Sequence, residues 1–278
     1  MNIKKHIPNT ITCGNLLCGC LAITTAFNGN LVLSAYFVGI AAVLDFFDGF
    51  TARLLKVHSD IGKQLDSLAD MVTFGVVPGV IVFKMMLMSL LGMDPHLAHN
   101  AYNGIFHVSM PILRELSKYG IDTNLFILLI PAIGFLIPIF SAIRLAKFNI
   151  DTRQTNSFIG VPTPANAILI CSLPLITDNQ PFMMGMDLRP LLYNVYFLGG
   201  LSTLMSFLLV AELPLFALKF KNFGWADNKI RYSFLLTALI LLFLFKFIAI
   251  PFIIFLYIIL SVVNNIQEQQ AGKNNITH

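Results

Sequence analysis

Long apolar stretches separated by short polar segments run along most of the 278-residue chain. A helix needs about 20 mostly apolar residues to cross the hydrocarbon core of a bilayer, and stretches near that length begin at about residue 11. The pattern predicts eight transmembrane helices, at about residues 11–27, 32–55, 63–92, 124–146, 163–177, 190–217, 232–247 and 249–264. We therefore expect an all-α integral membrane protein with a single transmembrane domain over residues 1–264.

The pattern leaves some segments open to two interpretations. The fifth predicted span is short, and Pro251 would allow residues 232–264 to form one bent hairpin instead of two clean crossings. Residues 93–123 are polar and are expected to form the one long outer loop. Residues 265–278 have too few apolar side chains to pack and are expected to form a disordered cytoplasmic tail.

The composition agrees with a membrane protein. Charged residues make up 12% of the chain and hydrophobic residues 56%, whereas a soluble domain carries about 25% charged residues. The four cysteines lie in apolar stretches without a Cys-x-x-Cys spacing, so they indicate neither a disulfide framework nor a zinc site. The net charge of +4 requires no nucleic-acid partner, because basic residues in membrane proteins first set orientation.

The distribution of basic residues predicts that both termini face the cytoplasm. With that orientation, 13 lysines and arginines fall in inner segments and four in outer segments, and Lys84 lies within the third span. Positive residues concentrate on the cytoplasmic side of membrane proteins. We expect the protein in a bacterial inner membrane, with both termini on the cytoplasmic side.

Four aspartates lie near the cytoplasmic end of the second and third predicted spans. Asp45 and Asp48 are three residues apart, and Asp66 and Asp70 are four apart, so each pair lies on one face of a helix with Cβ atoms about 5–6 Å apart. Only residues 54–61 join the two helices. The helices must then be antiparallel neighbours, which allows the two pairs to face each other at similar depth.

This arrangement favours a metal site. A carboxylate at the membrane centre costs about 2.5–3.5 kcal/mol, and four together repel one another unless a cation binds. Hard oxygen ligands suit Mg²⁺ or Mn²⁺, and a pair of ions could bridge phosphate oxygens during an in-line displacement. The alternative is a set of structural ion pairs between the aspartates and nearby basic residues: Arg53, Lys56, Arg144 and Lys147.

The residues around the aspartates resemble the signature of the CDP-alcohol phosphotransferase family. The match comprises eight fixed positions over 26 residues, and none departs from the pattern: Asp45, Asp48, Gly49, Ala52, Arg53, Gly62, Asp66 and Asp70. The resemblance implies a metal-dependent membrane transferase that moves a phosphate-linked group from a CDP-linked donor to an alcohol and releases CMP. It also implies a bundle of the same type and a homodimer.

The same resemblance implies roles for individual residues. The four aspartates correspond to the ligands of two divalent metal ions, and Asp70 also corresponds to the general base. The residues that correspond to the donor-binding part of the family are Asn9, Thr12, Gly49, Ala52, Arg53, Ser59 and Gly62. For the N-terminal segment an alternative stays open, because Thr10 or Thr12 could instead cap the first helix at the membrane surface.

Further stretches are similar to the phosphatidylserine synthase branch of this family. They include residues 7–16, 66–78, 140–149 and 158–167. The resemblance implies CDP-diacylglycerol as the donor and L-serine as the acceptor. Arg144 and Lys147, one turn apart at the cytoplasmic end of the fourth span, could bind the serine carboxylate.

Arg144 and Lys147 could also have different roles. They could anchor the helix at the cytoplasmic face, or contact the donor phosphates or the phosphate of an inositol-phosphate or glycerol-phosphate acceptor. A sibling enzyme with such an acceptor is therefore one alternative function. A cation transporter is a second, although an ion pathway should place acids at successive depths on several helices.

Overall fold

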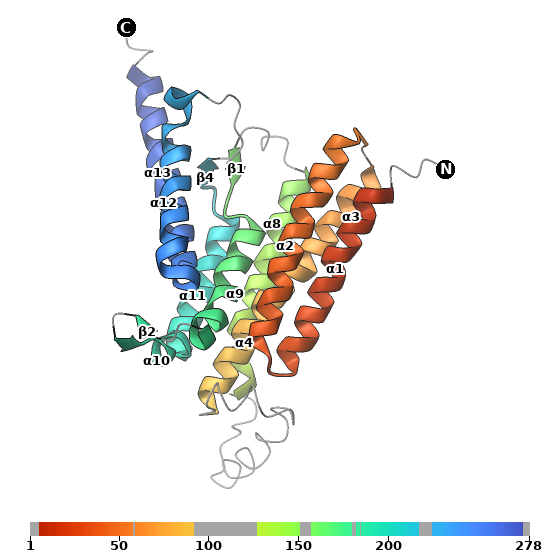
Figure 1. The fold of residues 1–278 in the computed structure, drawn as a ribbon, viewed down its shortest axis with the longest axis vertical. Coiled ribbons are helices and arrows are strands. Elements are labelled where there is room, and N and C mark those ends of the chain that lie inside the picture. Colours follow the sequence, from red (N-terminus) through yellow and green to blue (C-terminus); the bar gives the residue numbers. More distant parts are fainter. Residues whose placement is uncertain are drawn as a thin grey trace.

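The computed structural model describes residues 6–57, 59–91, 127–150, 157–179, 182–183, 185–216 and 224–274. The predicted polar loop at 93–123 lies outside these residues. Helices that run up and down a common axis make up most of the described chain (Figure 1). The predicted all-α class is confirmed.

The chain begins with a helical hairpin. Helix α1 (His6–Phe27) and helix α2 (Leu31–Leu54) pack along their lengths. Gly29 makes the reversal possible because its φ of 84° lies in the left-handed region, which glycine adopts without a steric penalty. The Asn30 side chain then caps α2 by accepting a hydrogen bond from the Leu33 amide at 2.9 Å.

The third predicted span is continuous but contains three parts: α3 (Asp60–Asp70), the π-helix η2 (Met71–Val76) and α4 (Val77–Leu90). Helix α4 forms the buried centre of the bundle, and Ile81, Met85 and Met86 are fully buried. Helix α3 differs sharply, because Ala69 is the only fully buried residue among its 11 described residues. The apolar core therefore holds α4 directly and α3 only weakly.

The middle of the chain surrounds α4. The segment formed by the 3₁₀-helix η3 (Pro131–Phe135) and α8 (Leu136–Ile150) packs against α11 (Val195–Val210), while α9 (Thr163–Asn179) packs against α2. This part of the chain also contains the short helix α10 (Arg189–Leu192) and two antiparallel strand pairs. The pairs are β1 (Ser157–Ile159) with β4 (Pro214–Phe216), and β2 (Phe182–Met183) with β3 (Met186–Asp187).

The predicted span at 190–217 is wrong in its extent. Residues in this range form α10, α11 and β4, and the continuous helix covers only 16 residues. Leu215 in β4 pairs with Phe158 in β1. The backbone of this apolar segment therefore pairs as a strand and does not extend the helix.

The last two helices form a hairpin beside the rest of the bundle (Figure 1). Helix α12 (Trp225–Phe245) ends in the 3₁₀-helix η4 (Lys246–Ile248), where Lys246 adopts φ 48°, and α13 (Ala249–Asn274) runs back alongside it. The turn therefore precedes Pro251. Because α13 extends to Asn274, the predicted disordered tail at 265–278 is helical over residues 265–274.

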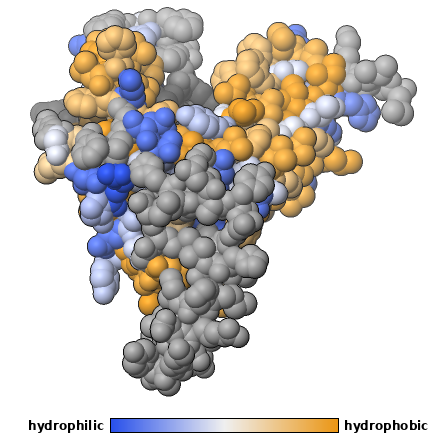
Figure 2. Space-filling model, turned by 60° about the horizontal axis from the view of Figure 1, so that its bottom comes forward, coloured by the Kyte–Doolittle hydropathy of each residue, from blue (hydrophilic) through white to orange (hydrophobic). Residues whose placement is uncertain are grey.

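The described helices suit a membrane environment. Five segments are long and apolar enough to cross a bilayer: His6–Phe27, Leu31–Leu54, Asp60–Leu90, Ile127–Ile150 and Asn228–Asn265. Large apolar areas also lie on the face drawn in Figure 2. The predicted number of eight crossings remains a prediction, because α9 and α11 have only 17 and 16 residues and the last segment contains a hairpin.

Candidate active site

The two aspartate pairs meet at one end of the bundle, where α2 ends and α3 begins. Carboxylate oxygens of Asp45, Asp48 and Asp66 all lie within 4.8 Å of one another. Asp48 is buried, and the other two are partly buried. Asp70 lies one turn further along α3, and Asp45 and Asp66 are its electrostatic neighbours. The structure thus brings the four predicted acids together.

The short link between α2 and α3 creates this arrangement. Lys56 adopts a left-handed conformation with φ 52°, and the Val57 amide donates a hydrogen bond to the Ala52 carbonyl at 3.0 Å. This pattern ends a helix sharply. The Ser59 side chain then starts α3 by accepting a hydrogen bond from the Gly62 amide at 3.2 Å. The chain reverses within five residues, so both carboxylate pairs occupy the same level.

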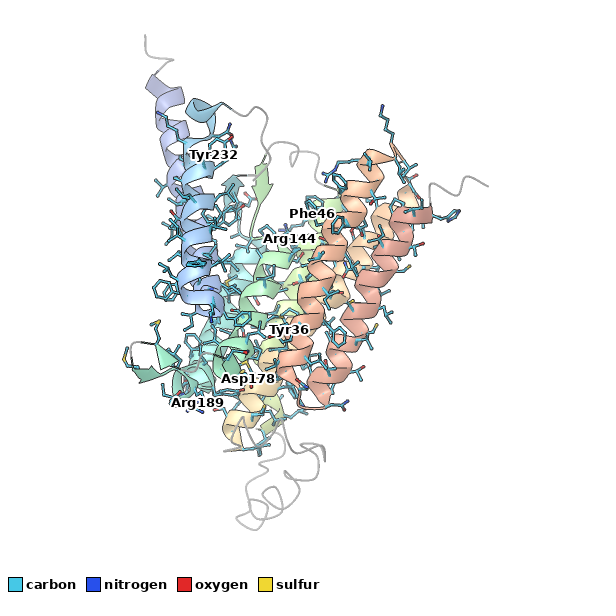
Figure 3. All side chains as sticks on the ribbon, in the orientation of Figure 1. Tyr36, Phe46, Arg144, Asp178, Arg189 and Tyr232 are labelled. Carbon is cyan, nitrogen blue, oxygen red and sulfur yellow. The ribbon has the colours of Figure 1, made fainter. Side chains whose placement is uncertain are left out.

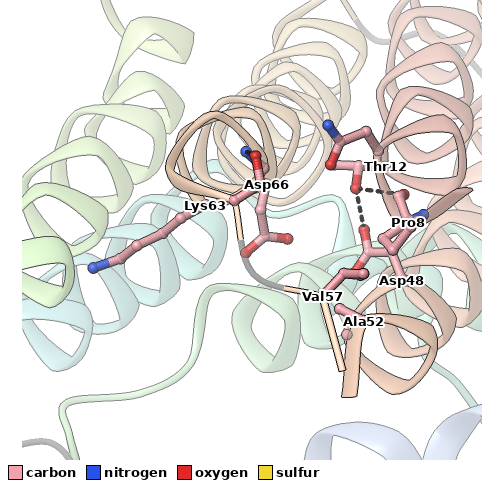
Figure 4. A pocket seen from close by; sticks show the side chains of 11 residues that line it. Pro8, Thr12, Asp48, Ala52, Val57, Lys63 and Asp66 are labelled. Atoms are coloured by element: carbon pink, nitrogen blue, oxygen red, sulfur yellow. Dashed lines mark hydrogen bonds between the residues drawn. The ribbon is translucent and has the colours of Figure 1, made fainter. Parts of the chain in front are cut away.

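Helix α1 supplies hydrogen bonds to both helices. Thr12 Oγ1 lies 2.7 Å from Asp48 Oδ2 and 3.1 Å from the Pro8 carbonyl (Figure 4). Asn15 Nδ2 donates to Asp70 Oδ1 at 3.3 Å. Because α1 already begins at His6, the alternative in which Thr10 or Thr12 caps the helix is wrong.

Asn15 is a site residue that the sequence interpretation missed. Its side chain is fully buried, and its Oδ1 has no hydrogen-bond partner among the described residues. It follows Thr12 by three residues, so both lie on the face of α1 that points to the aspartates. That spacing was the available signal, although it requires knowing that α1 packs against α3.

A cleft of about 200 Å³ opens beside the aspartates between α1, α2 and α3. Six of the predicted donor-binding residues line it: Asn9, Thr12, Gly49, Ala52, Ser59 and Gly62. A Cβ atom at Gly62 would lie 2.9 Å from Asn9 Oδ1, so the close approach of α1 favours glycine there. Arg53 is exposed and does not line the cleft.

Among the described residues, lysine and arginine side chains form no direct ion pair with the four clustered acids. Within the described residues, Arg189 and Asp187 form an ion pair, whereas none of the four clustered aspartates does. The structure therefore does not support the ion-pair alternative for these acids. Carboxylate oxygens gathered in this way form the donor set that a hard divalent cation prefers, and Asp45, Asp48 and Asp66 could hold one.

Arg144 and Lys147 differ in their surroundings. Arg144 is 8% exposed, its Nη1 lies 3.5 Å from Thr163 Oγ1, and Asp70 is an electrostatic neighbour. Its Nε has no hydrogen-bond partner among the described residues. Figure 3 places Arg144 near the same end of the bundle as Phe46, the neighbour of Asp45. Lys147 is exposed, so only Arg144 combines burial with proximity to the acids.

Comparison with known proteins identifies the family. Residues 5–263 match the model of the CDP-alcohol phosphatidyltransferase family. The chain is 33% identical over 193 residues to a CDP-diacylglycerol–serine O-phosphatidyltransferase of Bacillus subtilis (strain 168), which covers 68% of this chain and 85% of that protein. The protein of that name from Helicobacter pylori (strain J99) is 29% identical over 239 residues, covering 85% of this chain and 79% of the relative.

A more distant relative carries a related name. The archaetidylserine synthase of Methanothermobacter thermautotrophicus is 25% identical over 183 residues, which cover 63% of this chain and 62% of that protein. The family match extends over almost the whole chain and includes the aspartates and the cleft. The chain therefore belongs to the CDP-alcohol phosphatidyltransferase family and is a transferase with membrane-spanning helices.

Proposed function

We propose that the chain is a CDP-diacylglycerol–serine O-phosphatidyltransferase. The serine hydroxyl oxygen attacks the phosphorus that bears diacylglycerol, the bond from that phosphorus to the CMP oxygen breaks, and CMP leaves with the electron pair. The observation that carries the proposal is the cleft, because six of the residues that correspond to the family's donor-binding positions line it together with Asp48 and Asp66. Relatives that carry this name support serine as the acceptor.

The four aspartates would hold divalent metal, Mg²⁺ or Mn²⁺, with two ions as the family resemblance implies. Bound metal would neutralise the charge of the donor pyrophosphate. Asp70 would accept the proton of the serine hydroxyl as general base, and the hydrogen bond from Asn15 would fix the orientation of its carboxylate. Phosphoryl-type transfer depends mainly on such positioning and charge neutralisation.

The remaining residues of the cleft would bind the CDP part of the donor. Asn9 and Thr12 offer hydrogen-bonding groups from α1, while Gly49, Ala52 and Gly62 leave room near the helix backbones. Ser59 lines the same cleft while capping α3. Arg53, one turn after Gly49, would supply positive charge from the exposed rim.

The site would face the cytoplasm of a bacterial cell from the inner membrane. Helix α1 begins and α13 ends at the end of the bundle that carries the aspartates (Figure 1), and the excess of basic residues favours this end as the inner one. Serine and CMP would then exchange with cytoplasmic water, while the acyl chains stay in the lipid. A homodimer is part of the proposal through family resemblance.

The acceptor can be tested directly. Purified protein with CDP-diacylglycerol, Mn²⁺ and labelled serine is expected to form phosphatidylserine and one CMP for each molecule made. The same protein without serine serves as the control and should release little CMP. Release of CMP only with glycerol 3-phosphate, inositol or inositol phosphate would reject serine and favour a sibling enzyme.

The donor site predicts a specific effect of Gly49→Ala. A Cβ at Gly49 meets no atom within 4 Å, and alanine stabilises a helix relative to glycine by about 1 kcal/mol, so the protein should stay folded. The methyl group would nevertheless enter the cleft, and we expect KM for CDP-diacylglycerol to rise about tenfold, as for the loss of 1.4 kcal/mol of binding.

Gly39→Ala is the matched control. Gly39 lies on the same helix, is also exposed, and likewise has no atom within 4 Å of an added Cβ, but it does not line the cleft. Its KM should equal that of the wild type. Equal KM values for both variants would contradict donor binding beside Gly49.

A further inference from the structure

Asn149, in the last turn of α8, joins this helix to α3 through two hydrogen bonds. Its Nδ2 donates to Ser67 Oγ at 2.9 Å, and Lys63 Nζ donates to the Asn149 carbonyl at 3.0 Å. Ser67 in turn donates to the Lys63 carbonyl at 3.2 Å. Figure 4 shows the Lys63 amine pointing away from Asp66 and Asp48, although Lys63 is among the residues that line the cleft.

The contact matters because α3 has little apolar packing of its own. Ala69 is its only fully buried residue, and η2 interrupts the α-helical hydrogen-bond ladder between α3 and the buried α4. The main packing partner of α3 is α1. The hydrogen bonds to Asn149 on the side of α8 would therefore help to limit how α3 rotates about its axis.

Rotation of α3 would move the acids directly. Ser67 follows Asp66 and precedes Asp70 by three residues, and the two acids face Asp45 and Asp48 from the other helix. A small rotation would separate the carboxylate oxygens that now lie within 4.8 Å of one another. Helix α8 also carries Arg144, so the same link fixes the arginine relative to the acids.

We propose that Asn149 is a positioning residue for the metal site. It holds α3 in the rotation at which Asp66 and Asp70 meet Asp45 and Asp48, and it acts through Ser67 without touching the reacting atoms. The inference rests on the metal-binding role in the proposed function, but not on the identity of the acceptor. Removal of a side chain that orients metal ligands typically lowers metal affinity by about 10–100-fold.

The test compares Mn²⁺ binding by full-length variants without substrates. Electron paramagnetic resonance of free Mn²⁺ would follow the titration of wild type, Asn149→Ala, Ser67→Ala and the double variant. We expect each single variant to raise the half-saturating Mn²⁺ concentration about tenfold. The double variant should equal the singles, because both changes remove the same interaction. Ser67→Ala also supplies the measurement if Asn149→Ala does not fold.

Lys84→Met is the control for general destabilisation. Lys84 Nζ donates to the Phe27 carbonyl at 3.1 Å and joins α4 to the opposite end of α1. Loss of this partly buried interhelix bond should lower thermal stability and leave Mn²⁺ binding unchanged. The control separates loss of positioning from loss of stability.

Two outcomes would overturn the inference: wild-type protein that binds no Mn²⁺, or unchanged Mn²⁺ binding in both single variants. If Mn²⁺ binding is unchanged and a separate assay of Asn149→Ala shows a raised KM for serine, Asn149 Oδ1, which has no partner among the described residues, contacts the acceptor instead. Wild-type protein that binds Mn²⁺ but forms no phosphatidylserine would reject the acceptor while leaving the positioning role supported by the variants.

Discussion

Asp70→Asn is expected to lower the rate of CMP release by about 10²–10⁴-fold, the usual contribution of a general base. Asparagine has nearly the same shape, so it can remain beside Asn15 and Asp45, but it can neither accept the serine proton nor give a negatively charged metal ligand. The helices should remain folded, because Asp70 contributes charge to the site and not apolar packing to the core. Initial rates with saturating CDP-diacylglycerol and serine provide the measurement.

Asp60→Asn is the matched control for this prediction. Asp60 begins the same helix, is exposed, and lies outside both the clustered acids and the cleft. Its rate should stay close to that of the wild type. A comparable loss in both variants would argue against a special role for Asp70.

Asp70→Asn also distinguishes a transferase from the alternative of a cation transporter. Wild-type protein in liposomes should show CDP-lipid chemistry that Asp70→Asn removes, without a cation flux that depends on Asp70. Cation flux without any release of CMP would reject the transferase mechanism. The structure gives the transporter little support, because the acids gather at one end of α2 and α3 instead of following a path through the bundle.

The sequence predicted the acid cluster correctly because that prediction depends on local geometry. Spacings of three and four residues place side chains on one helix face, and the short connection between Leu54 and Asp60 leaves few ways to arrange the helices. Both facts can be read within 26 residues of chain. The cleft residues followed from family resemblance, and most of them line one cavity.

Contacts between distant segments could not be read in this way. Asn15 and Asp70 are 55 positions apart, and Asn149 and Ser67 are 82 apart, so no local spacing reveals their pairing. Hydropathy also failed to distinguish the strand β4 from the end of a transmembrane helix. Leu215 is buried in β4, and an apolar residue is equally compatible with a helix in the membrane. Arg53 matched the signature, yet its side chain lies at the exposed surface.

Arg144→Gln is expected to raise KM for serine about tenfold or more, since a hydrogen-bonded charge contributes about 1.5–3 kcal/mol. Arg144 is buried and has an unpartnered Nε among the described residues, so it can receive a carboxylate without first breaking an ion pair. Glutamine keeps hydrogen-bonding groups near Thr163 but removes the positive charge. Lys147→Gln should have little effect, because Lys147 is exposed.

An acceptor without a carboxylate makes this prediction specific. Ethanolamine keeps the hydroxyl and amine of serine but lacks the carboxylate that Arg144 would bind. The wild type should therefore use it poorly, and Arg144→Gln should reduce the preference for serine over ethanolamine. If Arg144 instead binds the donor phosphate, the variant will raise KM for CDP-diacylglycerol and leave the preference unchanged. Because Asp70 is an electrostatic neighbour of Arg144, a carboxylate bound there would bring the serine hydroxyl to the proposed base, which links recognition of the acceptor to its activation.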